Sequence, residues 1–171
     1  MSLVLRIAPL VFVAAVVQVA TISGTRILWA EPDILLVTVI AVALVAGSIP
    51  GAVAGFAGGM LVDTMSLGTL GTTSILLILA GYWAGRYGET TGRGRAYAPS
   101  LAAFAITIVV AVGGIAVHFL LGQSVSARTA LVSALPTAVL AAGLVIPVHR
   151  IARALVGPAL QFERPRQAEF V

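Results

Sequence analysis

Six apolar stretches, each almost free of charged side chains, follow one another along this chain. They cover residues 7–24, 34–47, 51–65, 72–85, 98–121 and 129–148. A helix needs about 20 mostly apolar residues to cross the hydrocarbon core of a bilayer. Because only 9% of the residues are charged, against about a quarter in a soluble domain, the chain cannot cover a water-exposed surface. We therefore predict an all-α integral membrane protein, a bundle of six transmembrane helices.

Turn-forming residues separate these stretches and indicate the domain organisation. Residues 47–51 combine glycine, serine and proline, which is typical of a tight turn. The stretch that follows is short and rich in glycine, so we expect either a short transmembrane helix or a tilted, partly re-entrant one. The first stretch resembles a signal peptide, but no convincing cleavage site follows it. We predict one domain, residues 1–153, and then a basic, disordered cytoplasmic tail, residues 154–171.

All ten basic residues are arginines, and their distribution indicates the orientation of the bundle. Cytoplasmic loops of membrane proteins carry the excess of Lys and Arg. With six crossings and the N-terminus inside, the cytoplasmic side holds eight of the ten, which are Arg6, Arg86, Arg93, Arg95, Arg150, Arg153, Arg164 and Arg166. We therefore predict that both termini are cytoplasmic. Since the arginines are scattered and form no single patch, we expect no nucleic acid partner.

Small residues form a stripe near the middle of the sequence. They recur every four residues and end in an aspartate, as Gly51, Gly55, Gly59 and Asp63. On a helix these positions share one face, and the missing side chains allow another helix to approach closely. Ala43 and Gly47 repeat the spacing in the preceding stretch, so we expect these two helices to be neighbours. The face either packs within the bundle or meets a partner protein.

The aspartate of this stripe also belongs to a predicted polar cluster on the outer side of the membrane. A carboxylate near the end of an apolar helix costs a few kcal/mol unless it finds a partner or reaches the interface. The predicted topology places five residues on this side, namely Arg26, Asp33, Asp63, His118 and Arg128. Two interpretations stay open. Either Asp63 or Asp33 pairs with Arg26, or each side chain is solvated separately among the lipid headgroups.

The residue pattern argues against catalysis and metal binding. Cysteine is absent, and the two histidines, His118 and His149, lie on opposite sides of the predicted membrane, so they cannot share an ion. The two aspartates of the outer cluster are unsuited to an intramembrane aspartyl protease, because both lie near helix ends and not deep in facing helices. We therefore expect no cofactor, no metal and no enzymatic activity.

Residues 30–85 carry motifs that resemble a known family. The motifs are Pro32-Asp33, Gly47 with Pro50, Gly55-Phe56-x-Gly58-Gly59-Met60-Leu61-x-Asp63, Leu67-Gly68 and Gly81-Tyr82. Together they resemble the bacterial family of rod shape-determining proteins called MreD. Outside this region the resemblance extends to chain length, the number of spans and the short basic tail.

The resemblance implies a multi-pass protein of the bacterial plasma membrane that acts as a non-catalytic scaffold in cell elongation and cell shape. MreD-like proteins bind MreC, a protein with one membrane anchor. Through it they connect to MreB, to RodA and to a class B penicillin-binding transpeptidase. The resemblance also implies a fold similar to the substrate-binding membrane subunits of energy-coupling-factor vitamin transporters, although fold alone does not transfer function. The alternative function is a small-molecule binding subunit of that kind, which would need a pocket lined by several polar groups.

Overall fold

The computed structural model describes residues 3–22, 33–66, 70–91, 97–122 and 127–167, and of residues 21, 22, 127–131 and 158–167 it describes the backbone alone. All regular elements in these ranges are α-helices. They are α1 (Leu3–Ile22), α2 (Ile34–Ala46), α3 (Ser48–Met65), α4 (Thr72–Thr91), α5 (Ala98–Leu120) and α6 (Ala127–Gln167). The predicted all-α fold with six helices is confirmed.

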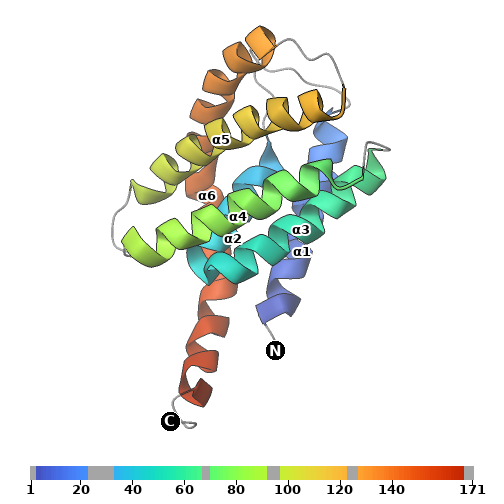
Figure 1. Cartoon of the computed structure of the whole chain (residues 1–171). Coiled ribbons are helices and arrows are strands. Elements are labelled where there is room, and N and C mark those ends of the chain that lie inside the picture. Colours follow the sequence, from blue (N-terminus) through green and yellow to red (C-terminus); the bar gives the residue numbers. More distant parts are fainter. Residues whose placement is uncertain (1–2, 23–32, 67–69, 92–96, 123–126, 168–171) are drawn as a thin grey trace.

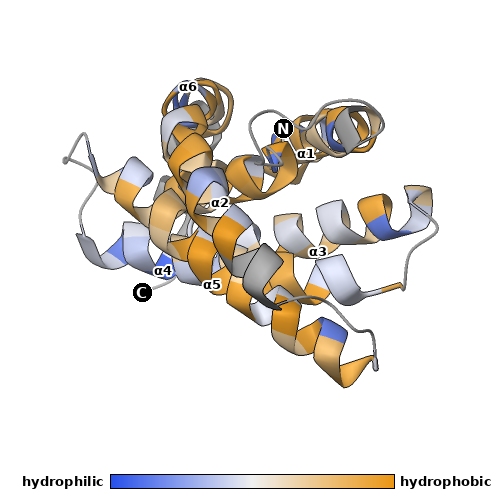
Figure 2. Cartoon of the chain, turned by 90° about the horizontal axis from the view of Figure 1, so that it is seen from above, coloured by the Kyte–Doolittle hydropathy of each residue, from blue (hydrophilic) through white to orange (hydrophobic). Residues whose placement is uncertain are grey.

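The helices run in two main directions. In Figure 1, α1 and α6 run from the top to the bottom of the view, and α3, α4 and α5 cross them. In Figure 2, which looks down on the same arrangement, α1 and α6 are seen nearly end-on, and orange apolar residues cover much of every helix. α3 and α4 form the most extensive helix pair of the bundle. They are antiparallel, because a short turn joins them.

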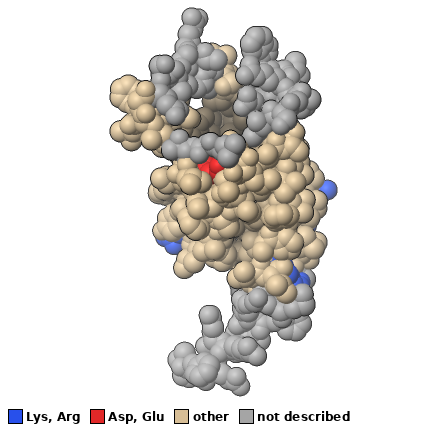
Figure 3. Space-filling model, turned by 90° about the vertical axis from the view of Figure 1, so that its right-hand side faces the viewer, with Lys and Arg blue, Asp and Glu red and all other residues tan. Residues whose placement is uncertain are grey.

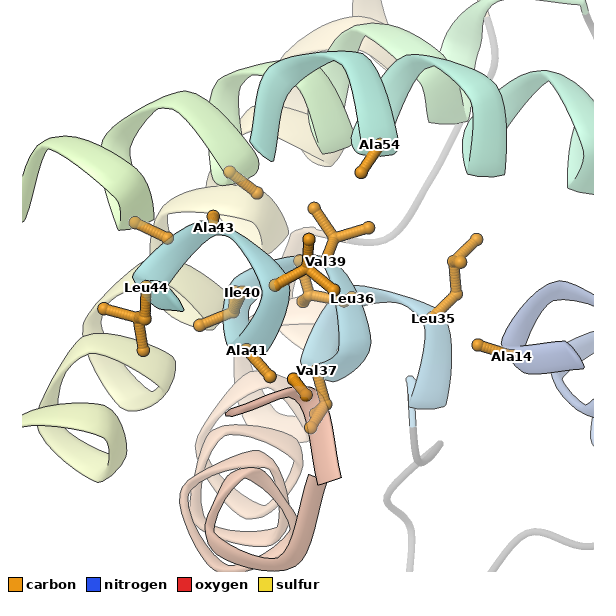
Figure 4. Close-up of a cluster of buried hydrophobic side chains, with 14 of the residues drawn as sticks. Ala14, Leu35, Leu36, Val37, Val39, Ile40, Ala41, Ala43, Leu44 and Ala54 are labelled. Carbon is orange, nitrogen blue, oxygen red and sulfur yellow. The ribbon is translucent and has the colours of Figure 1, made fainter. Parts of the chain in front are cut away.

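The core of the bundle is built around α2, which contacts each of the other five helices. Every residue from Leu35 to Val45 is buried. Figure 4 shows side chains of α2 pointing to several sides of the helix, for example Val39 toward Ala54 of α3, while Ala14 of α1 lies near the start of α2. A helix enclosed on all sides needs no polar face, which explains why α2 is uniformly apolar.

Three helices in the described part of the chain are long and apolar enough to cross a membrane by themselves, over Leu3–Ala20, Ala98–Leu120 and Val132–Gly157. α2 is equally apolar but has only 13 residues. That corresponds to about 20 Å, against about 30 Å for the hydrocarbon core. Because the other helices enclose α2, protein and not lipid surrounds it.

The last helix is longer than the sequence predicts. α6 continues past residue 148, where we predicted the sixth span to end, and its backbone is helical as far as Gln167. It therefore enters the segment that we predicted to be disordered. Packing explains the extension as far as residue 156, since Ala152 and Val156 are fully buried. The division between domain and tail at residue 153 stays a prediction.

Candidate functional site: a glycine face and three interhelical caps

The glycine face of α3 lies against α4. Gly55 packs on the backbone of Leu77, and Gly59 packs on the backbone of Ser74. A Cβ atom added at either glycine would overlap with that backbone, which cannot move aside as a side chain can. The two helices are therefore as close as their main chains allow, and this contact requires glycine at both positions.

Gly51 lies where three helices meet. A Cβ atom added there would be 2.7 Å from the Gly81 carbonyl oxygen of α4, and it would overlap with the Ala43 side chain of α2. Gly81 packs in turn on the backbone of Gly51, so both sides of this contact lack a side chain. α2 and α3 are thus neighbours at Ala43, but α4 covers most of the stripe.

The glycine stripe of α3 therefore packs against another helix of the same chain. Gly51, Gly55 and Gly59 are all buried, so a partner protein reaches them only if α3 and α4 separate. Of the two uses that the sequence left open, the structure favours packing inside the bundle. The opposite side of α3 is exposed and carries large apolar residues, which are Ile49, Val53, Phe56 and Met60.

Asp63, at the end of the stripe, caps the start of α4. Its Oδ2 atom accepts hydrogen bonds from the Gly71 backbone N–H at 2.8 Å and from the Ser74 hydroxyl at 3.5 Å, and its Oδ1 atom accepts one from the Thr73 N–H at 3.3 Å. The first N–H groups of a helix have no partner within it, and they carry partial positive charge. The start of α4 therefore stabilises a carboxylate that is only 3% exposed.

Glu89, near the end of α4, does the same for α3. Its Oε1 atom accepts hydrogen bonds from the Ser48 backbone N–H at 2.8 Å and from the Ser48 hydroxyl at 3.0 Å. These two bonds lower the pKa of Glu89, and Arg86, 3.4 Å away, lowers it further. Gly47 has a φ of +104°, and a Cβ atom there would lie 2.9 Å from Glu89 Oε1. Glycine therefore serves both the bend and the cap.

A third cap closes the start of α2. The side chain of Gln18, on α1, accepts hydrogen bonds through Oε1 from the N–H groups of Ile34 at 2.7 Å and Leu35 at 3.4 Å. Asp33 Oδ1 accepts from the Leu36 N–H at 2.9 Å. Gln18 of α1 and Asp33, the N-cap residue of α2 itself, thus share the first backbone donors of α2.

Each start of α2, α3 and α4 is thus capped by a side chain from another helix. Such donors cost several kcal/mol each if they stay unpaired inside a membrane. Sequence reasoning placed Asp63 in a polar cluster and gave Gln18 and Glu89 no role. Gln18 interrupts an apolar stretch, and that interruption was the one signal for it. Glu89 lies in the hydrophilic segment after the fourth stretch, where nothing distinguishes a cap from a solvated side chain.

The predicted outer cluster is described only in part. Asp33 caps α2, Asp63 caps α4, and His118 lies in the last turn of α5. Arg26 lies outside the described residues, as does the side chain of Arg128. The pairing of Asp63 or Asp33 with Arg26 therefore stays a prediction. Separate solvation does not describe Asp63, since this carboxylate is buried against the turn before α4.

Comparison with known families gives a match over almost the whole chain. The sequence model described as rod shape-determining protein MreD matches residues 2–156. The chain belongs to the MreD family. The match includes all of the glycine face and all three caps. No curated protein and no solved structure matches the chain, so the predicted similarity in fold to vitamin-transporter subunits stays a prediction.

Membership in the MreD family confirms several expectations from the sequence. MreD proteins are multi-pass membrane proteins with a role in cell shape, and they are not enzymes. Within the described residues, no three His, Cys, Asp or Glu side chains gather into a group that could hold a metal ion. The polar side chains of the site bind backbone groups of neighbouring helices, which is a structural use.

Proposed function

We propose that this chain is a non-catalytic scaffold of the bacterial cell-elongation complex. It binds an MreC-like protein in the plasma membrane and helps to couple MreB to peptidoglycan synthesis by RodA and a class B penicillin-binding transpeptidase. The family match carries this proposal. A direct test is depletion of the protein in its rod-shaped host. We expect cells to become round and to recover when the wild-type chain is restored. Unchanged cell shape after full depletion would contradict the proposal.

The outer faces of the helices support a scaffold that meets its partners from the side. The glycine face is closed within the chain, while Ile49, Val53 and Phe56 are 74%, 59% and 51% exposed on the other side of α3. These three positions lie on one face of the helix, as a partner helix requires. Close packing drives helix association in lipid, where burial of apolar surface gains little. We assign the anchor helix of the MreC-like partner to this face of α3.

Alanine substitutions test this assignment. Replacing Ile49, Val53 and Phe56 together should reduce co-purification of the MreC-like protein from membranes. The matched control replaces three large, similarly exposed residues of α5, which are Leu101, Val109 and Val112. If both variants keep the partner equally well, the partner does not bind this face of α3. If both lose it equally, the loss reflects a general change of the bundle.

The proposed topology has six crossings with both termini in the cytoplasm. It is supported by the arginine distribution, which leaves two of the ten basic residues outside. Because the chain has no cysteine, a single introduced cysteine reports only its own position. In intact cells, a membrane-impermeant maleimide should label Ser124→Cys and should label Ser2→Cys and Ala168→Cys only after the membrane is broken. Labelling of Ser2→Cys in intact cells would refute this orientation.

A further inference from the structure

Three arginines lie at the end of the bundle where α1 begins, and, unlike Arg86, none of them pairs with an acidic residue in the described part of the chain. Arg6 of α1 donates a hydrogen bond from Nη1 to the Leu155 carbonyl oxygen of α6 at 2.9 Å. Arg150 and Arg153 lie on the same part of α6 and are exposed. None of the three forms an ion pair with a described carboxylate. Glu89 is already bonded to Ser48 and Arg86.

Two of the described acidic residues lie elsewhere in the bundle. Asp33 begins α2 and Asp63 is near the end of α3, both at the end of the bundle away from Arg6. Figure 3 shows this separation on one face, where red acidic atoms lie near the upper edge of the described surface and blue arginine atoms lie lower. Among the side chains that the structure describes, the three arginines around Arg6 therefore have no carboxylate bound to them.

Large apolar side chains are interleaved with these arginines. Val4 and Leu5 of α1 are 68% and 58% exposed, and Ile151 and Leu155 of α6 are 51% and 46% exposed. The hydrogen bond from Arg6 to α6 joins the two helices into one surface. We call it the α1–α6 basic surface, and it consists of Val4, Leu5, Arg6, Arg150, Ile151, Arg153 and Leu155. Exposed apolar residues beside cations are typical of protein surfaces at the headgroup level of a bilayer.

The length of α6 places this surface at that level. The backbone of α6 is helical over 41 residues, Ala127–Gln167, which correspond to about 60 Å. The hydrocarbon core is only about 30 Å thick. Part of α6 therefore lies outside the core, and the charged residues mark that part, because an arginine inside the core costs a few kcal/mol or more. Arg150 and Arg153 then lie among the headgroups, where anionic lipids expose phosphate.

We propose that the α1–α6 basic surface binds anionic phospholipid, with the three arginines contacting lipid phosphates and the four apolar residues contacting the first carbons of the acyl chains. This goes beyond the scaffold role, because it gives the protein a lipid preference of its own. Basic pockets between helices on the cytoplasmic side of membrane proteins bind anionic headgroups by the same chemistry. The binding does not depend on which way the bundle is oriented.

The test measures which lipid the full chain retains. The protein is reconstituted in an equimolar mixture of phosphatidylglycerol and phosphatidylcholine and extracted in mild detergent, and its bound lipids are counted by native mass spectrometry. We expect the wild type to retain phosphatidylglycerol preferentially. Each arginine-to-glutamine change in Arg6, Arg150 and Arg153 should lower the ratio of the two lipids about five-fold. Rising salt should also lower the ratio for the wild type, because exposed charges are screened.

Arg86→Gln is the matched control, because it removes the same charge from an arginine that already has an acidic neighbour. We expect it to leave the lipid ratio unchanged. The double variant Arg150→Gln/Arg153→Gln keeps the Arg6 bond to α6 and so separates lipid binding from folding. The proposal fails if the wild type shows no preference for phosphatidylglycerol, if its preference does not change with salt, or if Arg86→Gln lowers the ratio as much as the double variant. In those cases the three arginines either fix the orientation of the bundle in the membrane or bind an acidic protein.

Discussion

Replacing Gly51 by alanine tests the central packing contact of the bundle. The added Cβ atom would be 2.7 Å from the Gly81 carbonyl oxygen and would overlap with Ala43. Ordinary van der Waals contacts of a Cβ atom begin at 3.4 Å. α3 and α4 must therefore separate by about 0.7 Å, the difference between 3.4 and 2.7 Å. α3 cannot relieve the contact by moving toward α2, because Ala43 of α2 blocks that side. Overpacking costs about 1–3 kcal/mol, and a position enclosed by two helices belongs at the upper end. The helix preference of alanine returns about 1 kcal/mol, so we expect a net loss of about 2 kcal/mol.

The measurement is the thermal stability of the purified chain in detergent, followed as the fraction that stays monodisperse after heating. The matched control is Gly143→Ala in α6, where an added Cβ atom meets nothing within 4 Å, so only the gain of about 1 kcal/mol should appear. The double variant Gly51→Ala/Ala43→Gly removes one of the two obstacles and should recover part of the loss, a coupling expected of residues in contact. If Gly51→Ala and Gly143→Ala change stability alike, the close contact at Gly51 does not exist and the reasoning is refuted.

Three further predictions concern the caps, and the same thermal assay checks each. Asp63→Leu removes the acceptor for the start of α4 and should cost about 1–3 kcal/mol of stability. Asp63→Asn keeps an acceptor and should cost less. Equal losses for the two variants would show that the loss of stability does not come from the cap. Gln18→Leu should cost about 1–2 kcal/mol, because it leaves the N–H of Ile34 unpaired. Leucine itself suits the membrane, so without the cap this substitution would leave stability unchanged or raise it. Either of those results would contradict the cap. Glu89 lies beyond residue 85, where the predicted fourth span ends, and its bonds to Ser48 lower its pKa below the ordinary value of 4.5. Its stabilisation is therefore complete above that value and is lost as the pH falls through the lowered pKa, so Glu89→Gln should remove part of the acid dependence, and an identical pH profile would argue against it.

The sequence predicted the helices well because each is marked by local signals. Apolar runs gave their number, and Gly47 marks the break between α2 and α3. The predicted turn over residues 47–51 was too long, because α3 already begins at Ser48. The end of α6 was missed, because the arginines after residue 148 look like a tail. In the fold the helix turns Ala152 and Val156 inward and Arg150 and Arg153 outward, so both residue types suit one continuous helix.

The site was less predictable, because its partners come from different parts of the chain. A four-residue spacing shows that Gly51, Gly55 and Gly59 share a face, but it does not show which helix covers that face. The preceding helix was the nearest candidate with small residues. In the structure α4 covers the face, with its backbone at Leu77 and Ser74 against Gly55 and Gly59. Its own small residues Gly81 and Gly85 pack on Gly51 and Ser48, but our prediction gave them no role in this contact.

The caps explain how a bundle with so few charges keeps a defined shape in lipid. Close packing holds α3 against α4. Contacts made by glycine have no side chains that interlock, so they do not by themselves prevent the helices from sliding along each other. Asp63 and Glu89 act at opposite ends of this pair, and each fixes one helix relative to the first turn of the other. A shift by one turn, about 5.4 Å, would break both caps and leave the N–H groups at the starts of α3 and α4 without their side-chain acceptors. The carboxylates therefore set the register of the hairpin, and a fixed hairpin presents Ile49, Val53 and Phe56 in one constant arrangement. A scaffold that binds a partner helix by shape depends on that constancy, because lipid competes equally well for every apolar surface that does not fit.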